Sequence, residues 1–189
     1  WRLAAFRLRR RFYRRWSSMH SSSSKIRFVF VSPSHPGNVG AAARAIKTMG
    51  FAELVVVAPR DDGYRSAPEA VALATGAADV LAASRSFANL VEALAGVTVA
   101  YAMTGYDREF GPRMIDARFA AADCASRLRL EGAQAAFVFG TERSGLTNAE
   151  IERCQFSCAI PAEPSFSSLN LAQAVQVMAY ECQLALRAT

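Results

Sequence analysis

The sequence predicts an α/β protein with a parallel sheet covered by helices on both faces. Short apolar runs alternate with helical segments along most of the chain. Each run is almost continuously apolar, as is typical of parallel strands buried on both faces. The length of 189 residues and the apolar content of 52% also suit one domain of ordinary size with a substantial core.

Five runs are predicted to be strands, because each is short, apolar and rich in β-branched or aromatic residues. They are KIRFVFV (25–31), AELVVVAP (52–59), VTVAYAM (97–103), AAFVFG (135–140) and FSCAIP (156–161). Proline or glycine lies at the end of three of these runs and marks where the strand stops.

Helices are predicted between the strands from apolar residues at helical spacing. The segments are 37–49, 77–83, 87–95 and 116–130, and a last helix starts near Ser168 or Asn170 and runs toward Arg187. Two capping boxes, Ser66 with Glu69 and Thr147 with Glu150, predict two further short helices.

The formal net charge of +6 comes from one end of the chain. Residues 1–24 hold seven arginines and no acid, so the rest of the chain has 15 of the 22 lysines and arginines against all 16 acids. A body so close to neutrality attracts nucleic acid only through a local basic patch. We therefore divide the chain into a basic N-terminal extension, 1–24, disordered or non-native, and one domain, 25–189.

Three interpretations of the extension stay open. It is an Arg-rich arm for nucleic acid, a transit-type segment poor in acids, or sequence upstream of the true start. Met19, followed by a serine run and then the first strand, favours the third. None of the three changes the predicted fold.

Cysteine usage predicts reduced thiols and no metal. The four cysteines, at 124, 154, 158 and 182, form no CxxC pair, and both histidines lie far from them in sequence. A zinc site requires such ligands at short spacing. With no convincing secretory signal, we expect a cytoplasmic protein. No run reaches about 18 consecutive apolar residues, so no membrane span is expected.

Ligands of parallel α/β sheets bind beyond the carboxyl ends of the strands. Four segments rich in glycine, serine or proline follow predicted strands there: 32–40, 103–108, 140–146 and 161–170. We expect the functional site to be built from these segments.

The first segment holds Gly37 and Gly40 at a predicted helix start, where backbone N–H groups bind anions. The spacing is neither G-x-G-x-x-G nor a P-loop, which argues against a dinucleotide-dependent dehydrogenase. His35, before Pro36, is interpreted as a turn residue rather than a catalytic one. Arg44 follows among small residues and is either a solvated helix arginine or a guanidinium aimed at a phosphate or a developing oxyanion.

The third and fourth segments hold more polar residues than turns require. Glu142 either accepts hydrogen bonds from a ligand or pairs with Arg143, and the adjacent serine does not form a G-x-S-x-G elbow. Ser167, Ser168 and Asn170 crowd one helix start, where capping needs a single polar side chain. The surplus indicates contacts with a ligand or with backbone groups.

Three stretches, in this order and spacing, resemble the motifs of the SPOUT superfamily of RNA methyltransferases, and within it the TrmJ-type tRNA (cytidine/uridine-2′-O)-methyltransferases. They are SHPGNVGAAARAIKTMG, FGTERSGLTNAEI and IPAEPSFSSLNLAQAV, and the likeness covers about residues 25–188. The resemblance implies a deep C-terminal trefoil knot, a homodimer, S-adenosyl-L-methionine as cofactor and tRNA as substrate. It also implies nucleotide 32 of the anticodon loop, C or U, as the target.

The resemblance further implies roles for individual residues. It places Arg44 at the centre of methyl transfer to a ribose 2′-OH, with Ser168 and Asn38 beside it. Because a guanidinium keeps its proton, we expect Arg44 to orient the oxygen and stabilise its developing charge. The cofactor pocket that the resemblance implies consists of Met103, Thr104, Gly105, Gly140, Glu142, Ile160, Ser167, Ser168, Leu169 and Asn170.

Two positions depart from the family pattern. The chain reads AMTGY where relatives read GTSAR, which puts Met103 in place of a polar residue, and Thr141 replaces a common arginine. Two other interpretations of the function stay open: a non-catalytic RNA-binding dimer, and a 2′-O-methyltransferase that acts on rRNA.

Overall fold

The computed structural model describes residues 23–109 and 111–188, so almost all of the predicted extension, 1–24, lies outside the described residues. The strands are β1 (Ile26–Val31), β2 (Glu53–Val57), β3 (Arg85–Phe87), β4 (Val99–Met103), β5 (Met114–Asp116), β6 (Ala135–Phe139) and β7 (Phe156–Ala159). The helices are α3 (Pro36–Thr48), α4 (Pro68–Leu73), α5 (Ala78–Ala83), α6 (Leu90–Ala93), α7 (Ala117–Arg127), α8 (Asn148–Ile151) and α9 (Leu171–Ala188).

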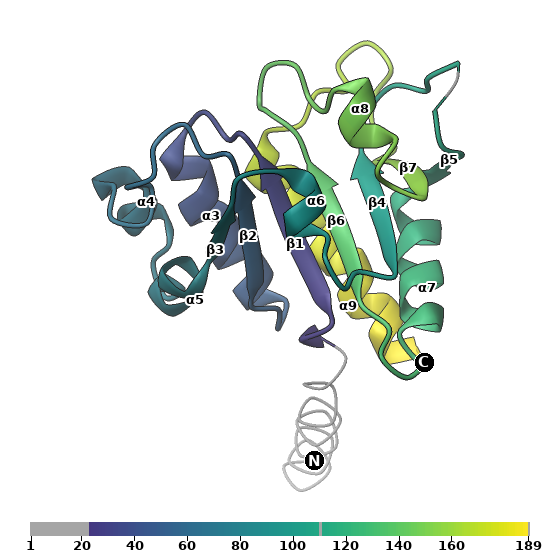
Figure 1. Ribbon diagram of the computed structural model, residues 1–189, viewed down its shortest axis with the longest axis horizontal. Coiled ribbons are helices and arrows are strands. Elements are labelled where there is room, and N and C mark those ends of the chain that lie inside the picture. The colour runs from purple at the N-terminus through teal and green to yellow at the C-terminus, as the bar shows by residue number, and fades with distance from the viewer. Residues whose placement is uncertain (1–22, 110, 189) are drawn as a thin grey trace, which may run out of the picture.

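The predicted parallel sheet is confirmed. Its strands pair in parallel in the order β3-β2-β1-β6-β4-β7-β5. At the centre, Phe28 lies opposite Phe137, which lies opposite Tyr101. The ring centroids of these neighbours are 6.2 Å and 4.8 Å apart. All strands therefore end at one edge, and the loops after β4, β6 and β7 project from that end of the molecule, at the top of Figure 1.

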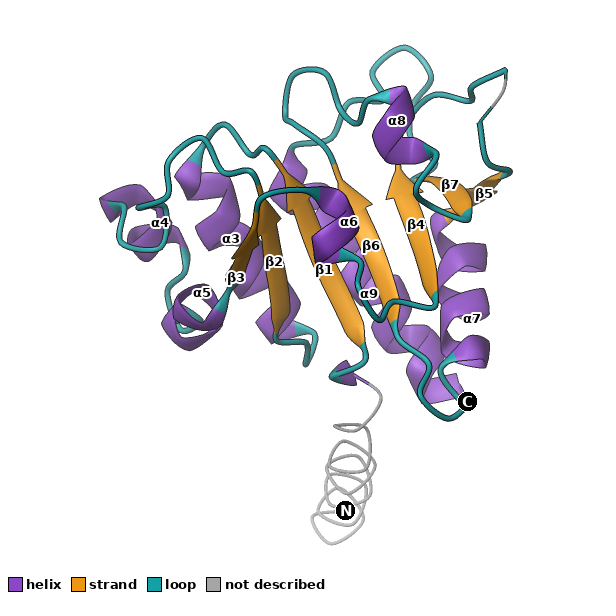
Figure 2. Cartoon of the chain, in the orientation of Figure 1, coloured by secondary structure: helices purple, strands orange, loops and turns teal. Residues whose placement is uncertain are grey.

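Helices cover both faces of the sheet, as predicted, but unequally (Figure 2). On one face, residues such as Phe30 and Phe139 form a large core with α3, α7 and α9. On the other face, smaller residues such as Val29 and Val138 pack under the short helices α6 and α8. Successive side chains of a strand point to opposite faces, so the central strands β1, β2, β4 and β6 contribute to both cores.

The prediction of five strands is wrong at the two edges of the sheet. β3 and β5 have three residues each and pair on one side only. The helix predicted over 87–95 is shorter in the structure, where α6 is capped by Asn89. The helix predicted from 116 begins one residue later, and Asp116 is its N-cap. Strands this short carry too few residues for a period-2 pattern.

One predicted capping box is confirmed and the other is wrong. Thr147 and Glu150 exchange side-chain-to-backbone hydrogen bonds at the start of α8. Ser66 instead donates its hydroxyl to the Gly63 carbonyl, because α4 starts at Pro68 rather than at residue 67. Proline suits the first helical position, since its φ is already helical and it has no N–H that needs a partner.

The four cysteines are buried and form no disulfide. Burial raises the pKa of Cys154 to about 12, so this thiol stays protonated at neutral pH. Within residues 23–109 and 111–188 there is no group of three or more side chains suited to hold a metal ion. No helix of the described residues combines the length and the hydropathy needed to cross a membrane.

Gly40 lets α3 pack against α4 at backbone distance. A Cβ at Gly40 would lie 2.0 Å from the carbonyl oxygen of Ala70 in α4, much closer than two such atoms approach. A Cβ at Gly37 would instead meet Leu73 Cδ1 at 3.1 Å, the end of a side chain that can rotate. Of the two glycines, only Gly40 is required by helix packing.

Gly40→Ala is expected to push α4 away from α3 and to lower the free energy of unfolding by about 2 kcal/mol or more. Gly37→Ala is the matched control on the same helix, and it should be close to neutral because alanine also favours helices. Urea unfolding of both variants and the parent chain measures the difference. Equal stability of the two variants would contradict the close backbone contact at Gly40.

Candidate functional site

Three of the four predicted segments line one cavity of about 250 Å³ at the carboxyl ends of β4, β6 and β7. Met103 lies at its base and is only 9% exposed, whereas residues 161–170 form an exposed wall. The cavity is lined by nine of the residues predicted for the cofactor pocket: Met103, Thr104, Gly105, Gly140, Glu142, Ile160, Ser167, Ser168 and Leu169. Asn170, the tenth, is not on the lining.

The structure adds lining residues that sequence reasoning missed. Tyr106 and Arg108 come from the loop after β4, Ser144 from the loop after β6, and Leu171 from α9. Tyr106, Arg108 and Ser144 could have been predicted, because they lie in segments expected to form the site. Leu171 carried no such signal, since it reads as an ordinary core residue of an amphipathic helix.

The wall after β6 is a tight backbone turn. The Thr141 and Gly145 backbones exchange hydrogen bonds of 3.1 and 3.0 Å. A Cβ on Gly140 would lie 2.1 Å from the Gly145 carbonyl carbon, and Gly145 has a φ of 67°. Both positions therefore require glycine for the turn itself. The Thr141 hydroxyl lies 2.8 Å from that of Ser144, so this departure from the family pattern helps to hold the turn.

The first segment, 32–40, joins the cavity through Glu142. The Glu142 carboxylate accepts hydrogen bonds from the backbone N–H groups of Ser34 at 2.8 Å and His35 at 3.3 Å, and from Asn38 Nδ2 at 2.9 Å. The anion at the start of α3 is thus a side chain of the protein, bound by amides next to the helix and not by Gly37 and Gly40 as predicted. No ion pair joins Glu142 to Arg143 in the part of the chain that the structure describes.

Glu142 is ionised at neutral pH. Partial burial would raise its pKa, but the hydrogen bonds from Asn38, Ser34 and His35 outweigh burial and hold the pKa below its usual value of 4.5.

Asn38 connects Glu142 to the last helix. Asn38 Oδ1 accepts a hydrogen bond from Asn170 Nδ2 at 3.1 Å, and Asn170 Oδ1 accepts one from the backbone N–H of Ala172 at 2.9 Å. Asn170 is therefore the cap of α9, and Ser168 makes no hydrogen bond to any described residue. The Glu142–Asn38–Asn170 chain, as we call these three residues, joins the loop after β6, the first turn of α3 and the loop after β7.

Arg44 lies outside the cavity of its own chain. It is exposed on α3, and its guanidinium has no hydrogen-bond or ion-pair partner among residues 23–109 and 111–188. It follows Gly37 by seven residues, which places it about 10 Å further along the helix axis. The structure thus brings Asn38 to the site and leaves Arg44 apart from it.

Arg108 fixes the loop after β4. Its guanidinium donates a hydrogen bond to the Leu146 carbonyl at 3.1 Å and another to Asn148 Oδ1. Leu146 lies just before α8 and Asn148 is its first residue, so Arg108 holds the loop after β4 to the loop after β6.

Glu142→Gln keeps the side-chain shape but removes the charge, and it is expected to lower the free energy of unfolding by about 1–2 kcal/mol at neutral pH. Because the folded-state pKa of Glu142 lies below 4.5, its contribution is present above pH 4.5 and is lost as the pH falls below that value through the folded-state pKa. The difference between parent and variant should therefore shrink in acid.

Urea unfolding across this pH range measures the effect. Glu152→Gln is the control, because Glu152 is an exposed glutamate whose side chain makes no hydrogen bond to the described residues. A difference between Glu142→Gln and the parent that stays constant with pH would contradict the role of the ionised carboxylate.

Comparison with known proteins finds similarity over this same region. Residues 25–180 match the SpoU rRNA Methylase family. The chain is 47% identical over 161 residues to the tRNA (cytidine/uridine/adenosine-2′-O-)-methyltransferase TrmJ of Pseudomonas aeruginosa, an alignment that covers 85% of this chain and 61% of that protein. The chain thus spans roughly three fifths of the length of the curated relatives it matches.

Solved structures share the fold. A probable methyltransferase from Bordetella pertussis Tohama I is 54% identical, with a TM-score of 0.84 over 88% of this chain and 99% of that one. TrmJ from Z. mobilis ZM4 is 36% identical, with a TM-score of 0.77 over 83% of this chain and 67% of that one. The resemblance carried by the three motifs is confirmed, and the chain belongs to the SpoU rRNA methylase family.

Proposed function

We propose that this domain transfers a methyl group from S-adenosyl-L-methionine to a ribose 2′-OH of tRNA, at nucleotide 32 of the anticodon loop, C or U. The observation that carries the proposal is the Glu142–Asn38–Asn170 chain, which draws the motif segments together around one cavity. The names of the curated relatives, which are tRNA 2′-O-methyltransferases, support the reaction and the substrate.

The cavity has the surfaces that this cofactor requires. Met103, Phe139 and Ile160 offer apolar walls for a flat base, and Ser167 and Ser168 add hydroxyl groups that make no hydrogen bond to the described residues. Met103, the departure from the family pattern, therefore suits an apolar part of the ligand. When bound, S-adenosyl-L-methionine supplies an electrophilic methyl group.

The residues of the chain position and activate the 2′-oxygen. Asn38 has a partner at each end of its amide, so we assign it a positioning role rather than contact with the ribose. Ser168 is exposed on the cavity wall, and we assign its hydroxyl a hydrogen bond to the 2′-oxygen. We assign Arg44 the stabilisation of negative charge that develops on this oxygen.

We further propose a homodimer in which each cavity receives Arg44 of the partner subunit. The support is that Arg44 is exposed, lacks a partner in the described residues and lies outside the cavity of its own chain. The guanidinium of Arg44 can donate several hydrogen bonds to an anion, and in the dimer it would do so in the cavity of the partner subunit.

The family resemblance also leads us to propose a deep C-terminal trefoil knot and a cytoplasmic location. After β7, near one edge of the sheet, the chain returns as α9 to pack against both α3 and α7, and such a return is compatible with a knot. Four buried thiols that form no disulfide suit a reducing compartment.

Arg44→Ala is expected to lower methyl transfer to a tRNA transcript at least about a hundredfold, because charge on the 2′-oxygen loses its stabilising group. Calorimetric titration should show unchanged binding of S-adenosyl-L-methionine. Arg129→Ala, an exposed arginine outside the site, is the matched control. Near-normal turnover of Arg44→Ala would refute the role assigned to Arg44. Methyl transfer by the parent chain to rRNA but not to tRNA would show that the substrate is rRNA.

Mixing two inactive variants tests the shared site. Gly105 lies on the cavity wall, and a Cβ there meets nothing within 4 Å, so Gly105→Trp should fold and fill the cavity. Co-expression of Gly105→Trp with Arg44→Ala should restore transfer, because one cavity of the mixed dimer then has both an open pocket and an arginine. Failure to restore transfer, with mixed dimers present, would place Arg44 and the cavity in the same chain.

A further inference from the structure

Two exposed aromatic side chains lie beside the mouth of the cavity. Phe166, in the exposed wall 161–170, is 82% exposed, and Tyr106, on the loop after β4, is 73% exposed. Tyr106 lines the cavity, and Phe166 directly precedes the lining residue Ser167. Single exposed apolar residues are common on proteins, but two large rings beside one cavity call for an explanation.

The backbone around both rings is held, while the rings themselves are free. The Phe166 N–H donates to the Glu163 carbonyl at 2.9 Å, and the Tyr106 N–H donates to the Thr104 hydroxyl at 3.3 Å. Neither ring stacks on another ring or on a cation within the described residues. Each loop therefore presents an aromatic face to solvent from a defined position.

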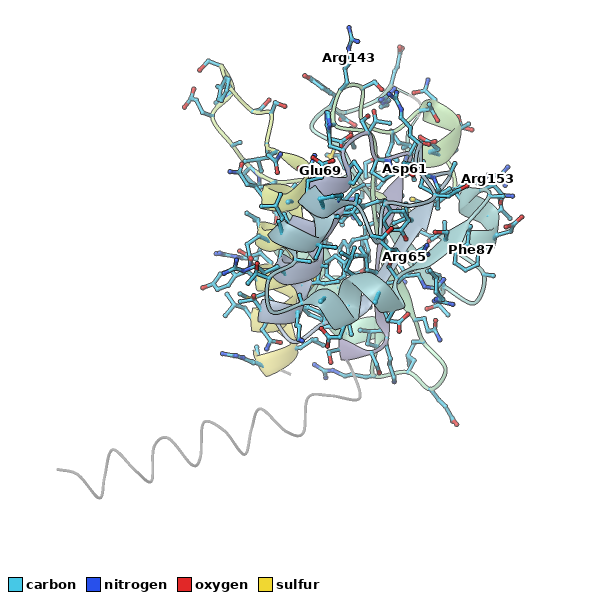
Figure 3. All side chains as sticks on the ribbon, turned by 90° about the vertical axis from the view of Figure 1, so that its left-hand side faces the viewer. Asp61, Arg65, Glu69, Phe87, Arg143 and Arg153 are labelled. Carbon is cyan, nitrogen blue, oxygen red and sulfur yellow. The ribbon has the colours of Figure 1, made fainter. Side chains whose placement is uncertain are left out.

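A third exposed side chain completes this rim. Arg143 lies in the turn after β6 and lines the cavity, and Figure 3 shows it extending away from the rest of the molecule. It makes no ion pair with a described residue, and its guanidinium is available for an anion. We refer to Tyr106, Arg143 and Phe166 as the rim residues, one from each of the three loops that line the cavity.

The chemistry of the rim matches unpaired RNA. A nucleobase offers two aromatic faces once it leaves its stack, and its phosphates are the anions that arginine binds best. Residues 25–189 have 15 basic side chains against 16 acidic ones, so bulk attraction to phosphates is weak. Stacking does not depend on net charge, and it can therefore supply affinity that the charge of this body does not.

We propose that Tyr106 and Phe166 stack on unpaired nucleobases of the RNA substrate at the mouth of the cavity, and that Arg143 binds a neighbouring phosphate. The proposal rests on the proposed function and adds the surface that selects unpaired RNA. A nucleotide held by its base at the mouth has its ribose close to the cavity, which is where the proposed reaction requires it.

Binding of the full chain to a fluorescein-labelled RNA stem-loop, followed by fluorescence anisotropy, tests the proposal. Phe166→Ala and Tyr106→Ala are each expected to weaken binding at least about fivefold. Phe166→Trp and Tyr106→Phe keep an aromatic ring and should bind like the parent. Leu130→Ala is the control, because Leu130 is 67% exposed and lies in the segment that leads from α7 to the amino end of β6, whereas the cavity lies at the carboxyl ends of the strands.

Salt dependence separates the arginine from the rings. Arg143→Ala should lower the slope of log affinity against log salt concentration by about 0.7, the value for one phosphate contact on a single strand. The ring substitutions should leave that slope unchanged. An RNA duplex of the same length should bind weakly and respond little to the ring substitutions, because its bases are not free to stack on protein.

Several results would overturn the proposal. Unchanged affinity for the stem-loop in both alanine variants would show that the rings do not contact RNA. A change in sedimentation of Phe166→Ala would assign its ring to an interface between copies of the chain. Failure of the parent chain to bind the stem-loop would also overturn it, whereas binding without methyl transfer would refute only the proposed function. Unchanged calorimetric binding of S-adenosyl-L-methionine by Phe166→Ala would support an effect confined to RNA.

Discussion

An ionised carboxylate at the start of a helix is the interaction on which the site depends. Glu142 comes from the loop after β6, yet its oxygens bind backbone amides and an asparagine that lie more than a hundred residues earlier in the chain. The N–H groups of Ser34 and His35 have no other partner among the described residues, and the positive end of the α3 dipole favours a negative charge there. Asn38 extends the contact to Asn170 and the start of α9. Charge-assisted hydrogen bonds to Glu142 thus hold the loop after β6 to the start of α3, and the amide–amide hydrogen bond between Asn38 and Asn170 adds the loop after β7.

The motif residues divide into those that build the site and those that remain free to act. Gly40 and Gly140 permit close backbone contacts, and Asn38 has a partner at each end of its amide. Ser168 and Arg44, by contrast, have no side-chain partner in the described part of the chain. A polar group without a partner is available to a ligand, whereas a satisfied one is bound to its present geometry. The hydrogen bonds of each side chain therefore distinguish structural residues from residues that can contact a ligand, and they do so more clearly than the motifs do.

Met103 and Thr141, the two departures from the family pattern, both fit their local surroundings. Met103 is the last residue of β4 and is almost fully buried at the base of the cavity, where a polar side chain would need a hydrogen-bond partner. Thr141 uses its hydroxyl to hold the turn that brings Gly145 against Gly140. Met103 thus lies at a strand end and Thr141 in a tight turn, where each side chain fits its surroundings.

The sequence by itself determined the parallel sheet, its five inner strands and the segments that gather at the carboxyl edge. These features follow from local patterns, because apolar runs and turn residues report burial and chain reversal over a few positions. Only the tertiary structure decided the three-residue edge strands, the contact of Gly40 with α4, the partners of Glu142 and the separation of Arg44 from the cavity. Glu142 and Asn38 are 104 residues apart, and Asn38 and Asn170 are 132 apart. Such pairs form only when strand order and register have been set, and no window of sequence contains both partners.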